Sequence, residues 1–188
     1  SYMSPETLTA MKHNMFTPGN YFYNGIGHVT VNYGKVITYG YSEYIKEIEE
    51  ELAGMRVSDA NYCKKHALLE AMLISLRAVI RYAKRYSRLA KEMAEKEQNG
   101  TRKAELLKIS ENCDRVPESG ARNFYEACQS FWFIQMLIQV ESSGHSISPG
   151  RFDQYMYPFY KKSLDAGMTR EQAQEYIDCI WVKLNDLN

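Results

Sequence analysis

The sequence lacks several features that would place it in a function class at once. Its 23 basic and 23 acidic residues cancel, so no charge excess points to nucleic acid or another polyanion as a partner. No apolar run approaches the roughly 20 residues that a membrane-spanning helix needs, and the first residues show no signal-peptide pattern. We therefore expect a cytoplasmic protein with no nucleic-acid or membrane partner, whose balanced charge suits a small neutral ligand.

Cysteine is also scarce, and its spacing is uninformative for metal or disulfide chemistry. The four cysteines are far apart, and no two of them form a Cys-x-x-Cys pair. This spacing excludes a disulfide framework and a zinc knuckle, so we expect no bound metal and a reducing compartment. Each cysteine is predicted to be a small core residue. They are Cys63, Cys113, Cys128 and Cys179.

The chain of 188 residues is long enough for one ordinary domain, and its periodicity predicts a mainly α fold. Residues 1–41 form a Gly/Tyr-rich arm, in which the alternation of Val29, Val31 and Tyr33 suits a short strand or extended segment. Helices are expected over 42–140 and 158–188, and a loop over 141–157. No initiator methionine opens the chain, and it ends directly after a helical pattern. We therefore expect an internal piece of a longer protein.

The predicted helices differ in their caps and buried faces. Ser42 can cap the first and Gly54 can end it, Thr101 can cap a helix that ends before Pro117, and residues 124–140 are apolar enough to be buried throughout. Thr169 and Gln172 have the spacing of a capping box. The longest helix has an apolar seam of Leu69, Met72, Leu76, Val79, Ala83, Tyr86, Ala90 and Met93. The last helix is expected to bury Ala173, Ile177, Ile180, Trp181 and Leu184.

The loop after the buried helix is the strongest candidate for a site. The pair His145-Ser146 lies there between Gly144 and the Pro149-Gly150 turn, so a rigid element delivers two hydrogen-bonding side chains. Imidazole and hydroxyl groups both donate and accept hydrogen bonds, which suits recognition of a polyol. A helix C-terminal cap followed by a local serine turn is the structural alternative.

Other residues near these segments have competing interpretations. His28 follows glycines that allow a close backbone approach, but it could equally be a turn histidine bonded to backbone. Arg151 and Asp153 favour an ion pair or a hydrogen-bonded turn over catalysis. Glu141 could act as a base, although pairing with Arg151 or a loop hydrogen bond is the better prediction. The three tyrosines after the turn are expected to pack with a polar edge. They are Tyr155, Tyr157 and Tyr160.

Longer motifs add a family resemblance that covers essentially the whole chain in order. The segment Gly144-His-Ser-Ile-Ser-Pro-Gly-Arg-Phe-Asp-Gln-Tyr-Met-Tyr-Pro resembles a signature of glycyl radical enzymes of the pyruvate formate-lyase superfamily, in the branch of glycerol and propanediol dehydratases and choline lyase. Four further segments agree with it. They are Pro18-Gly-Asn-Tyr-Phe-Tyr-Asn-Gly-Ile-Gly-His-Val-Thr-Val, Cys113-Asp-Arg-Val-Pro, Phe124-Tyr-Glu-Ala-Cys-Gln-Ser-Phe-Trp-Phe and Cys179-Ile-Trp-Val-Lys-Leu-Asn-Asp.

The resemblance implies roles for the histidines. His28 and Ser146 would orient a small diol, with Tyr23 also in the substrate-binding wall, and His145 would protonate the hydroxyl that leaves. Such a group leaves readily only when it is protonated while the remaining hydroxyl is deprotonated, so an acid and a base must flank the substrate. The family's complete fold is a ten-stranded α/β barrel, of which this chain would be a helical fragment.

The resemblance also shows what the chain does not contain. The family needs a Cys-x-Glu loop for the thiyl radical and a glycine in an Arg-Val-x-Gly-aromatic motif, and neither occurs here. We therefore expect the isolated chain to be inactive and to bind no cofactor. The parent enzyme would carry a glycyl radical that a radical S-adenosylmethionine activating enzyme installs. It would be a homodimer in the cytoplasm or in a bacterial microcompartment.

Two groups of alternatives remain open. Choline trimethylamine-lyase shares most of the surrounding sequence, and Tyr21 or Tyr23 could contact a trimethylammonium group. Arylacetate decarboxylases and sulfonate lyases of the superfamily are further candidates. A different class of function is a non-catalytic helical interaction module, in which the seam of the longest helix pairs with a partner helix.

Overall fold

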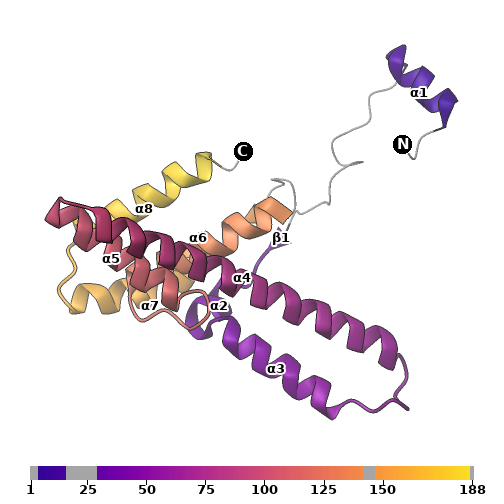
Figure 1. The fold of residues 1–188 in the computed structure, drawn as a ribbon, viewed down its shortest axis with the longest axis horizontal. Coiled ribbons are helices and arrows are strands. Elements are labelled where there is room, and N and C mark those ends of the chain that lie inside the picture. The colour runs from indigo at the N-terminus through magenta and orange to yellow at the C-terminus, as the bar shows by residue number, and fades with distance from the viewer. Residues whose placement is uncertain (1–3, 16–28, 142–146, 187–188) are drawn as a thin grey trace.

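The computed structural model describes residues 4–15, 29–141 and 147–186, and this part of the chain is mainly helical, as predicted (Figure 1). Two strands of two residues each are the only sheet in the described ranges. The helices are α1 (Pro5–Lys12), α2 (Tyr33–Tyr39), α3 (Tyr41–Gly54), α4 (Tyr62–Lys96), α5 (Gly100–Arg115), α6 (Phe124–Glu141), α7 (Phe152–Asp165) and α8 (Arg170–Asn185). The strands are β1 (Val29–Thr30) and β2 (Ile147–Ser148).

Two helices occupy part of the range that we predicted as an arm. Helix α1 lies apart from the others in Figure 1 and buries none of its residues. Helix α2 begins after Asn32, whose side chain accepts a hydrogen bond from the Lys35 amide at 3.3 Å. It buries Tyr33, Val36 and Ile37, which share one helical face. The prediction of an extended segment is confirmed for β1 and wrong for α2, because an asparagine cap and three core residues outweigh the neighbouring glycines.

Helices α3 and α4 form a long antiparallel pair that projects from the rest of the molecule, and α5 runs back along the second half of α4 (Figure 1). The buried positions of α4 agree with the predicted seam only at Ala83 and Ala90. Leu73, Ala83, Ser87, Ala90 and Ala94 are its buried residues. The predicted seam residues Met72, Tyr86 and Met93 are exposed by 41%, 45% and 47%. The partner helices, rather than the apolar pattern alone, determine which face is buried.

Helix α6 is the centre of the core, as its composition predicted. Its first two thirds bury nearly every residue, and α2, α7 and α8 all pack against it. The fully buried Glu126 carboxylate is bonded to the Arg122 side chain at 2.9 Å and to the Arg122 backbone amide at 2.7 Å. Pairing of this kind is what allows an acid to be buried in a helical core.

Helices α7 and α8 complete this core. The predicted capping box of α8 is present, since the Thr169 hydroxyl accepts from the Gln172 amide at 3.1 Å while the Gln172 side chain accepts from the Thr169 amide at 3.0 Å. Ala173 and Ile180 are buried as expected, but Trp181 is 65% exposed, so its predicted burial is wrong. In an α-helix, adjacent positions point about 100° apart, so Trp181 faces away from the surface that Ile180 buries.

Candidate functional site

The two strands bring together two segments that are remote in sequence. Strands β1 and β2 pair in parallel, with Val29 opposite Ile147 and Thr30 opposite Ser148. His28 directly precedes β1, and the His145-Ser146 pair directly precedes β2. These three residues and Tyr23 lie outside the described residues. The structure therefore shows the register of the two strands that follow these residues in the sequence.

A buried glutamine connects both strands to the core. Gln135 of α6 is 1% exposed, and its side-chain Oε1 accepts a hydrogen bond from the hydroxyl of Tyr33, which is completely buried. The Gln135 Nε2 donates to the Ile147 carbonyl of β2 at 3.1 Å. The backbone amide of Tyr33 donates to the Val31 carbonyl at 2.9 Å, directly after β1. One amide side chain is thus bonded to β2 and to the helix that continues from β1.

Tyr155 of α7 holds the turn that follows β2. Its hydroxyl donates to the Pro149 carbonyl at 2.8 Å, while its ring stacks on Tyr33 with centroids 5.7 Å apart. Gly150 adopts a φ of +64°, and a Cβ at this position would come within 2.7 Å of the Thr30 methyl group. The positive φ and the close approach of the turn to β1 both favour glycine at this position.

Burial also determines the protonation state of these phenols. Burial raises the pKa of Tyr33 well above its usual value, and the nearby Tyr41 adds to the effect. Burial raises the pKa of Tyr155 in the same direction, with Tyr33 as the second cause. Both hydroxyls remain protonated near neutral pH and are available as hydrogen-bond donors.

Three residues were predicted to support the loop, and they do not form the expected ion pairs. The predicted site loop ends earlier than position 157, because α7 begins at Phe152. Within the described ranges, no ion pair joins Arg151 to Asp153 or to Glu141, and all three are exposed. Arg151 instead holds the turn through its backbone carbonyl, which accepts from the amides of Gln154 at 3.0 Å and Tyr155 at 3.3 Å. Asp153 lies in the first turn of α7, where a negative charge favours the helix.

The predicted tyrosine cluster divides between two faces of α7. Tyr155 packs with a polar edge, as expected. Tyr160 contacts the edge of Phe124 with ring centroids 5.5 Å apart, whereas Tyr157 is 59% exposed.

The four cysteines divide between the core and the surface. Cys113 and Cys128 are buried as predicted, but Cys63 and Cys179 are exposed, so the prediction that all four are core residues is wrong.

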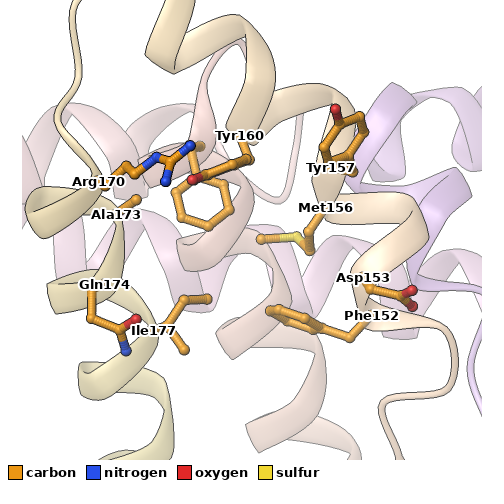
Figure 2. Close-up of a pocket in the computed structure, with 10 residues that line it drawn as sticks. Phe152, Asp153, Met156, Tyr157, Tyr160, Arg170, Ala173, Gln174 and Ile177 are labelled. Atoms are coloured by element: carbon orange, nitrogen blue, oxygen red, sulfur yellow. The ribbon is translucent and has the colours of Figure 1, made fainter.

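A cavity of about 390 Å³ lies between α7 and α8 (Figure 2). Its floor is mainly apolar, and Figure 2 shows Arg170 near Tyr160 at one end and Asp153 beside Phe152 at the other. Of the predicted site residues that the structure describes, only Asp153 lines it. Its lining residues are Phe124, Phe152, Asp153, Met156, Tyr157, Tyr160, Arg170, Ala173, Gln174 and Ile177.

The described part of the chain shows neither a metal site nor a membrane span. No group of three or more His, Cys, Asp or Glu side chains there could hold a metal ion. No helix among the same residues is both long and apolar enough to cross a membrane.

The sequence did not identify Gln135 and Tyr33 as important for the loop. The available signal was a glutamine in the middle of a helix that is otherwise apolar on nearly every side, since a buried amide needs hydrogen-bond partners. Its partners could not be read from the sequence, because Tyr33 lies 102 positions away.

The family model for pyruvate formate lyase-like proteins matches residues 1–188. The chain belongs to this family, and the resemblance seen in its motifs is thereby confirmed.

The relatives of known structure include diol dehydratases. A solved structure concerned with 1,2-propanediol dehydration in Roseburia inulinivorans is 61% identical to this chain, with a TM-score of 0.88 over 98% of the chain and 22% of that protein. The glycerol-bound B12-independent glycerol dehydratase from Clostridium butyricum is 51% identical, with a TM-score of 0.86 over the whole chain and 24% of that protein.

Curated relatives include a sulfite-lyase and a further dehydratase. The isethionate sulfite-lyase of Desulfovibrio desulfuricans is 45% identical over 154 residues, which are 80% of this chain and 18% of that enzyme. The (2S)-3-sulfopropanediol dehydratase of Klebsiella oxytoca is 38% identical over 173 residues, which are 92% of this chain and 21% of that enzyme. The chain thus spans about a fifth of the length of the curated relatives that it matches.

Proposed function

We propose that this chain forms the hydroxyl-binding wall of a glycyl radical dehydratase that acts on a small diol, either 1,2-propanediol or glycerol. The observation that carries the proposal is the parallel pairing of Val29 with Ile147 and of Thr30 with Ser148. It concerns the residues that directly follow His28 and Ser146 in the chain.

The pairing supports a shared site for the following reason. Parallel strands begin at the same edge of a sheet, and neighbouring strands lie about 4.8 Å apart. His28 is the residue before β1 and Ser146 the residue before β2, and consecutive Cα atoms are about 3.8 Å apart. The described residues that follow His28 and Ser146 therefore begin at the same edge of the sheet, which supports the proposal that the two segments serve one site.

The residue types suit the chemistry of dehydration. Elimination of water requires a proton for the departing hydroxyl and an acceptor for the proton of the hydroxyl that remains. In the proposal, His145 donates the first proton, while His28 and Ser146 orient the diol by hydrogen bonds, with Tyr23 in the same wall. Glu141 is exposed at the end of α6, so we assign it no role in proton transfer.

The complete enzyme would supply what this chain lacks. None of its four cysteines is followed two places on by glutamate, and no Arg-Val-x-Gly-aromatic motif occurs in it. A glycyl radical, installed by a radical S-adenosylmethionine activating enzyme, would provide hydrogen-atom abstraction when present. The chain's own residues would bind the substrate, orient it and move protons. We accordingly propose that the isolated chain has no turnover and that the complete enzyme is a homodimer in the cytoplasm or a microcompartment.

The comparisons favour a diol over the other substrates considered. The two dehydratase structures are 61% and 51% identical to this chain, and the isethionate sulfite-lyase is 45% identical. Carbon–sulfur bond cleavage is the second candidate, supported by that relative. A sulfonate carries a permanent negative charge and would need a cationic partner, for which the exposed Arg151 beside the Gly150 turn is available. Choline, the alternative suggested by the motifs, has weaker support.

The proposal can be tested in the complete enzyme that contains this chain. The enzyme would be produced anaerobically, activated, and assayed for aldehyde formation from 1,2-propanediol and glycerol and for sulfite release from isethionate. His145→Ala is expected to lower kcat by about 10²- to 10⁴-fold, the contribution of a positioned general acid. His28→Ala and Ser146→Ala should mainly raise KM, because they remove substrate hydrogen bonds.

The matched control is His66→Ala, because His66 lies on α4, outside the proposed wall. Its ring centroid is 5.5 Å from that of Tyr62. This change should leave turnover unaltered. Sulfite release without aldehyde formation from a diol would establish the second candidate instead. Full activity of the His145→Ala enzyme, or dehydration of a diol by the isolated chain, would contradict the proposed roles.

A further inference from the structure

We propose that Gln135 and Tyr33 are positioning residues, which hold the two substrate-binding segments side by side through a buried hydrogen-bonded bridge. This inference rests on the proposed function, because it concerns the same wall. It adds two residues that lie in the core.

The strand pair needs support from outside. Each strand has two residues, and a pairing this short specifies its register weakly. Three of the four paired residues are exposed, so burial contributes little to holding them together. Only Ile147, at 5% exposed, is anchored in the interior. A slip of one residue would move every side chain of β2 to the opposite face.

Gln135 supplies that support at the first residue of β2. Its Nε2 donates to the Ile147 carbonyl at 3.1 Å, which fixes the backbone of the residue directly after Ser146. The amide orientation is determined, because a carbonyl can only accept and Nε2 can only donate. The remaining Oε1 must then accept, and the Tyr33 hydroxyl donates to it.

Tyr33 connects the same amide to β1. It is the first residue of α2, and its backbone amide bonds to the Val31 carbonyl at 2.9 Å, one residue beyond β1. Its ring is enclosed by Phe131, at a centroid distance of 5.0 Å, and by Tyr155, at 5.7 Å. The hydroxyl therefore has a fixed direction toward Gln135. A shift of β2 would break the bond to Ile147, and a shift of the start of α2, which follows β1, would break the bond to Tyr33; either change leaves a buried polar group unpaired.

Packing alone does not explain this bridge. The neighbouring Ile134 is completely buried in the same helix, so an aliphatic residue is accommodated at this depth. The cost of removing the Gln135 amide from water is offset because both of its polar atoms form hydrogen bonds. One bond is made to β2 and the other to α2, the helix that follows β1. The bridge thus links the geometry of the site to the most buried part of the fold.

The test compares Gln135→Leu, Tyr33→Phe and the control Ile134→Val in the complete activated enzyme. Gln135→Leu removes both hydrogen bonds at nearly constant volume, and Tyr33→Phe removes one. We expect kcat/KM for the preferred diol to fall by about 10²-fold for Gln135→Leu, with most of the loss in kcat, because displacement of positioned groups by about 1 Å has this effect. Tyr33→Phe should lose less. Ile134→Val should stay within about twofold of the wild type in kcat, although it also perturbs the core.

Amide hydrogen exchange provides a readout that requires no turnover. Peptides that contain residues 29–31 and 147–150 should exchange faster in Gln135→Leu than in the wild type, and should be unchanged in Ile134→Val. Unchanged exchange in Gln135→Leu would overturn the bridge. Faster exchange with wild-type kcat, or an equal loss of kcat in Ile134→Val, would overturn its positioning role.

The two proposals can fail separately. If the wild-type enzyme does not dehydrate a diol, the proposed function has failed, and the kinetic comparison is made with the substrate that it does use. If Gln135→Leu does not fold, Tyr33→Phe decides, since it removes one hydroxyl and keeps the ring. Faster exchange and lower kcat in Tyr33→Phe support the bridge, and wild-type behaviour in both overturns it.

Discussion

Substitution of Gly150 by alanine tests how closely the turn after β2 must approach β1. The change has two separable costs. First, the φ of +64° places an L-residue in the left-handed region, which costs about 1 kcal/mol. Second, the new Cβ would meet the Thr30 methyl group at 2.7 Å, well inside the roughly 3.5–4.0 Å optimum for two carbon atoms. Relief by a shift of the exposed Thr30 side chain or the turn costs about 1–2 kcal/mol. We expect a total loss of about 2–3 kcal/mol in the free energy of unfolding.

A double-mutant cycle separates the two costs. Thr30→Ser removes only the methyl group that the new Cβ would meet, so Gly150→Ala should cost about 1 kcal/mol less in the Thr30→Ser background. Gly167→Ala is the control for backbone strain alone, because Gly167 has a φ of +99° and no atom within 4 Å of an added Cβ. Urea unfolding followed by circular dichroism measures the stabilities of the four proteins of the cycle and of the Gly167→Ala control. A coupling energy below about 0.5 kcal/mol would refute the contact, since this is the range for independent sites.

Three further predictions concern protonation and capping. Burial raises the pKa of Tyr41 and Tyr125 from 10.0 to about 12, so the contribution of these two tyrosines to the free energy of unfolding should be constant to about pH 10 and fall from pH 10 to 12, where only the unfolded chain releases these protons; titration of all tyrosines near pH 10 in the folded chain, followed at 295 nm, would contradict this. Burial raises the pKa of the Cys113 and Cys128 thiols to about 12, so at pH 8 Ellman's reagent should label the two exposed cysteines rapidly and these two only after denaturation; rapid labelling of all four would argue against a closed core. Thr169→Ala should lower the free energy of unfolding by about 1 kcal/mol and Thr169→Ser by much less, and equal losses would show that the cap hydroxyl contributes nothing.

The helices that could be predicted are those in which local signals agree. At α8, the Thr169-Gln172 capping box and the apolar spacing after it both indicate a helix start, and the structure has one there. At α6, continuous apolar composition predicted a buried helix, and α6 is the core element. Local consistency of this kind is independent of the rest of the fold.

The predictions that failed depend on tertiary contacts. Helix α7 continues through Pro158, although proline normally ends a helix, because Met156 and Phe159 on either side of it pack into the core cluster. Ser87 is buried in α4, where it lies 3.2 Å from the hydroxyl of Ser110 on α5. A polar residue with a polar partner is invisible to an apolar pattern.

The residues of the candidate site remain predictions from the family pattern, whereas the side chains that support the adjoining strands could not be predicted at all. The types and order of His28, His145 and Ser146 could be matched to a family pattern from sequence alone. The bridge from Tyr33 to Gln135 and Ile147 could not, because it depends on which buried side chains face one another.

The bridge also orders the steps in which the wall can form as the chain folds. The bond from Gln135 to Ile147 closes only 12 positions of chain, whereas the bond from Tyr33 to Gln135 closes 102. Closing a longer loop costs more chain entropy, so the short link is expected first. β2 would then be bonded to α6 before β1 pairs with it. The Gln135 side chain would already be oriented to accept the hydrogen bond from Tyr33 when the N-terminal segment docks. The loss of stability in Tyr33→Phe should accordingly appear mainly as faster unfolding, with little change in the folding rate.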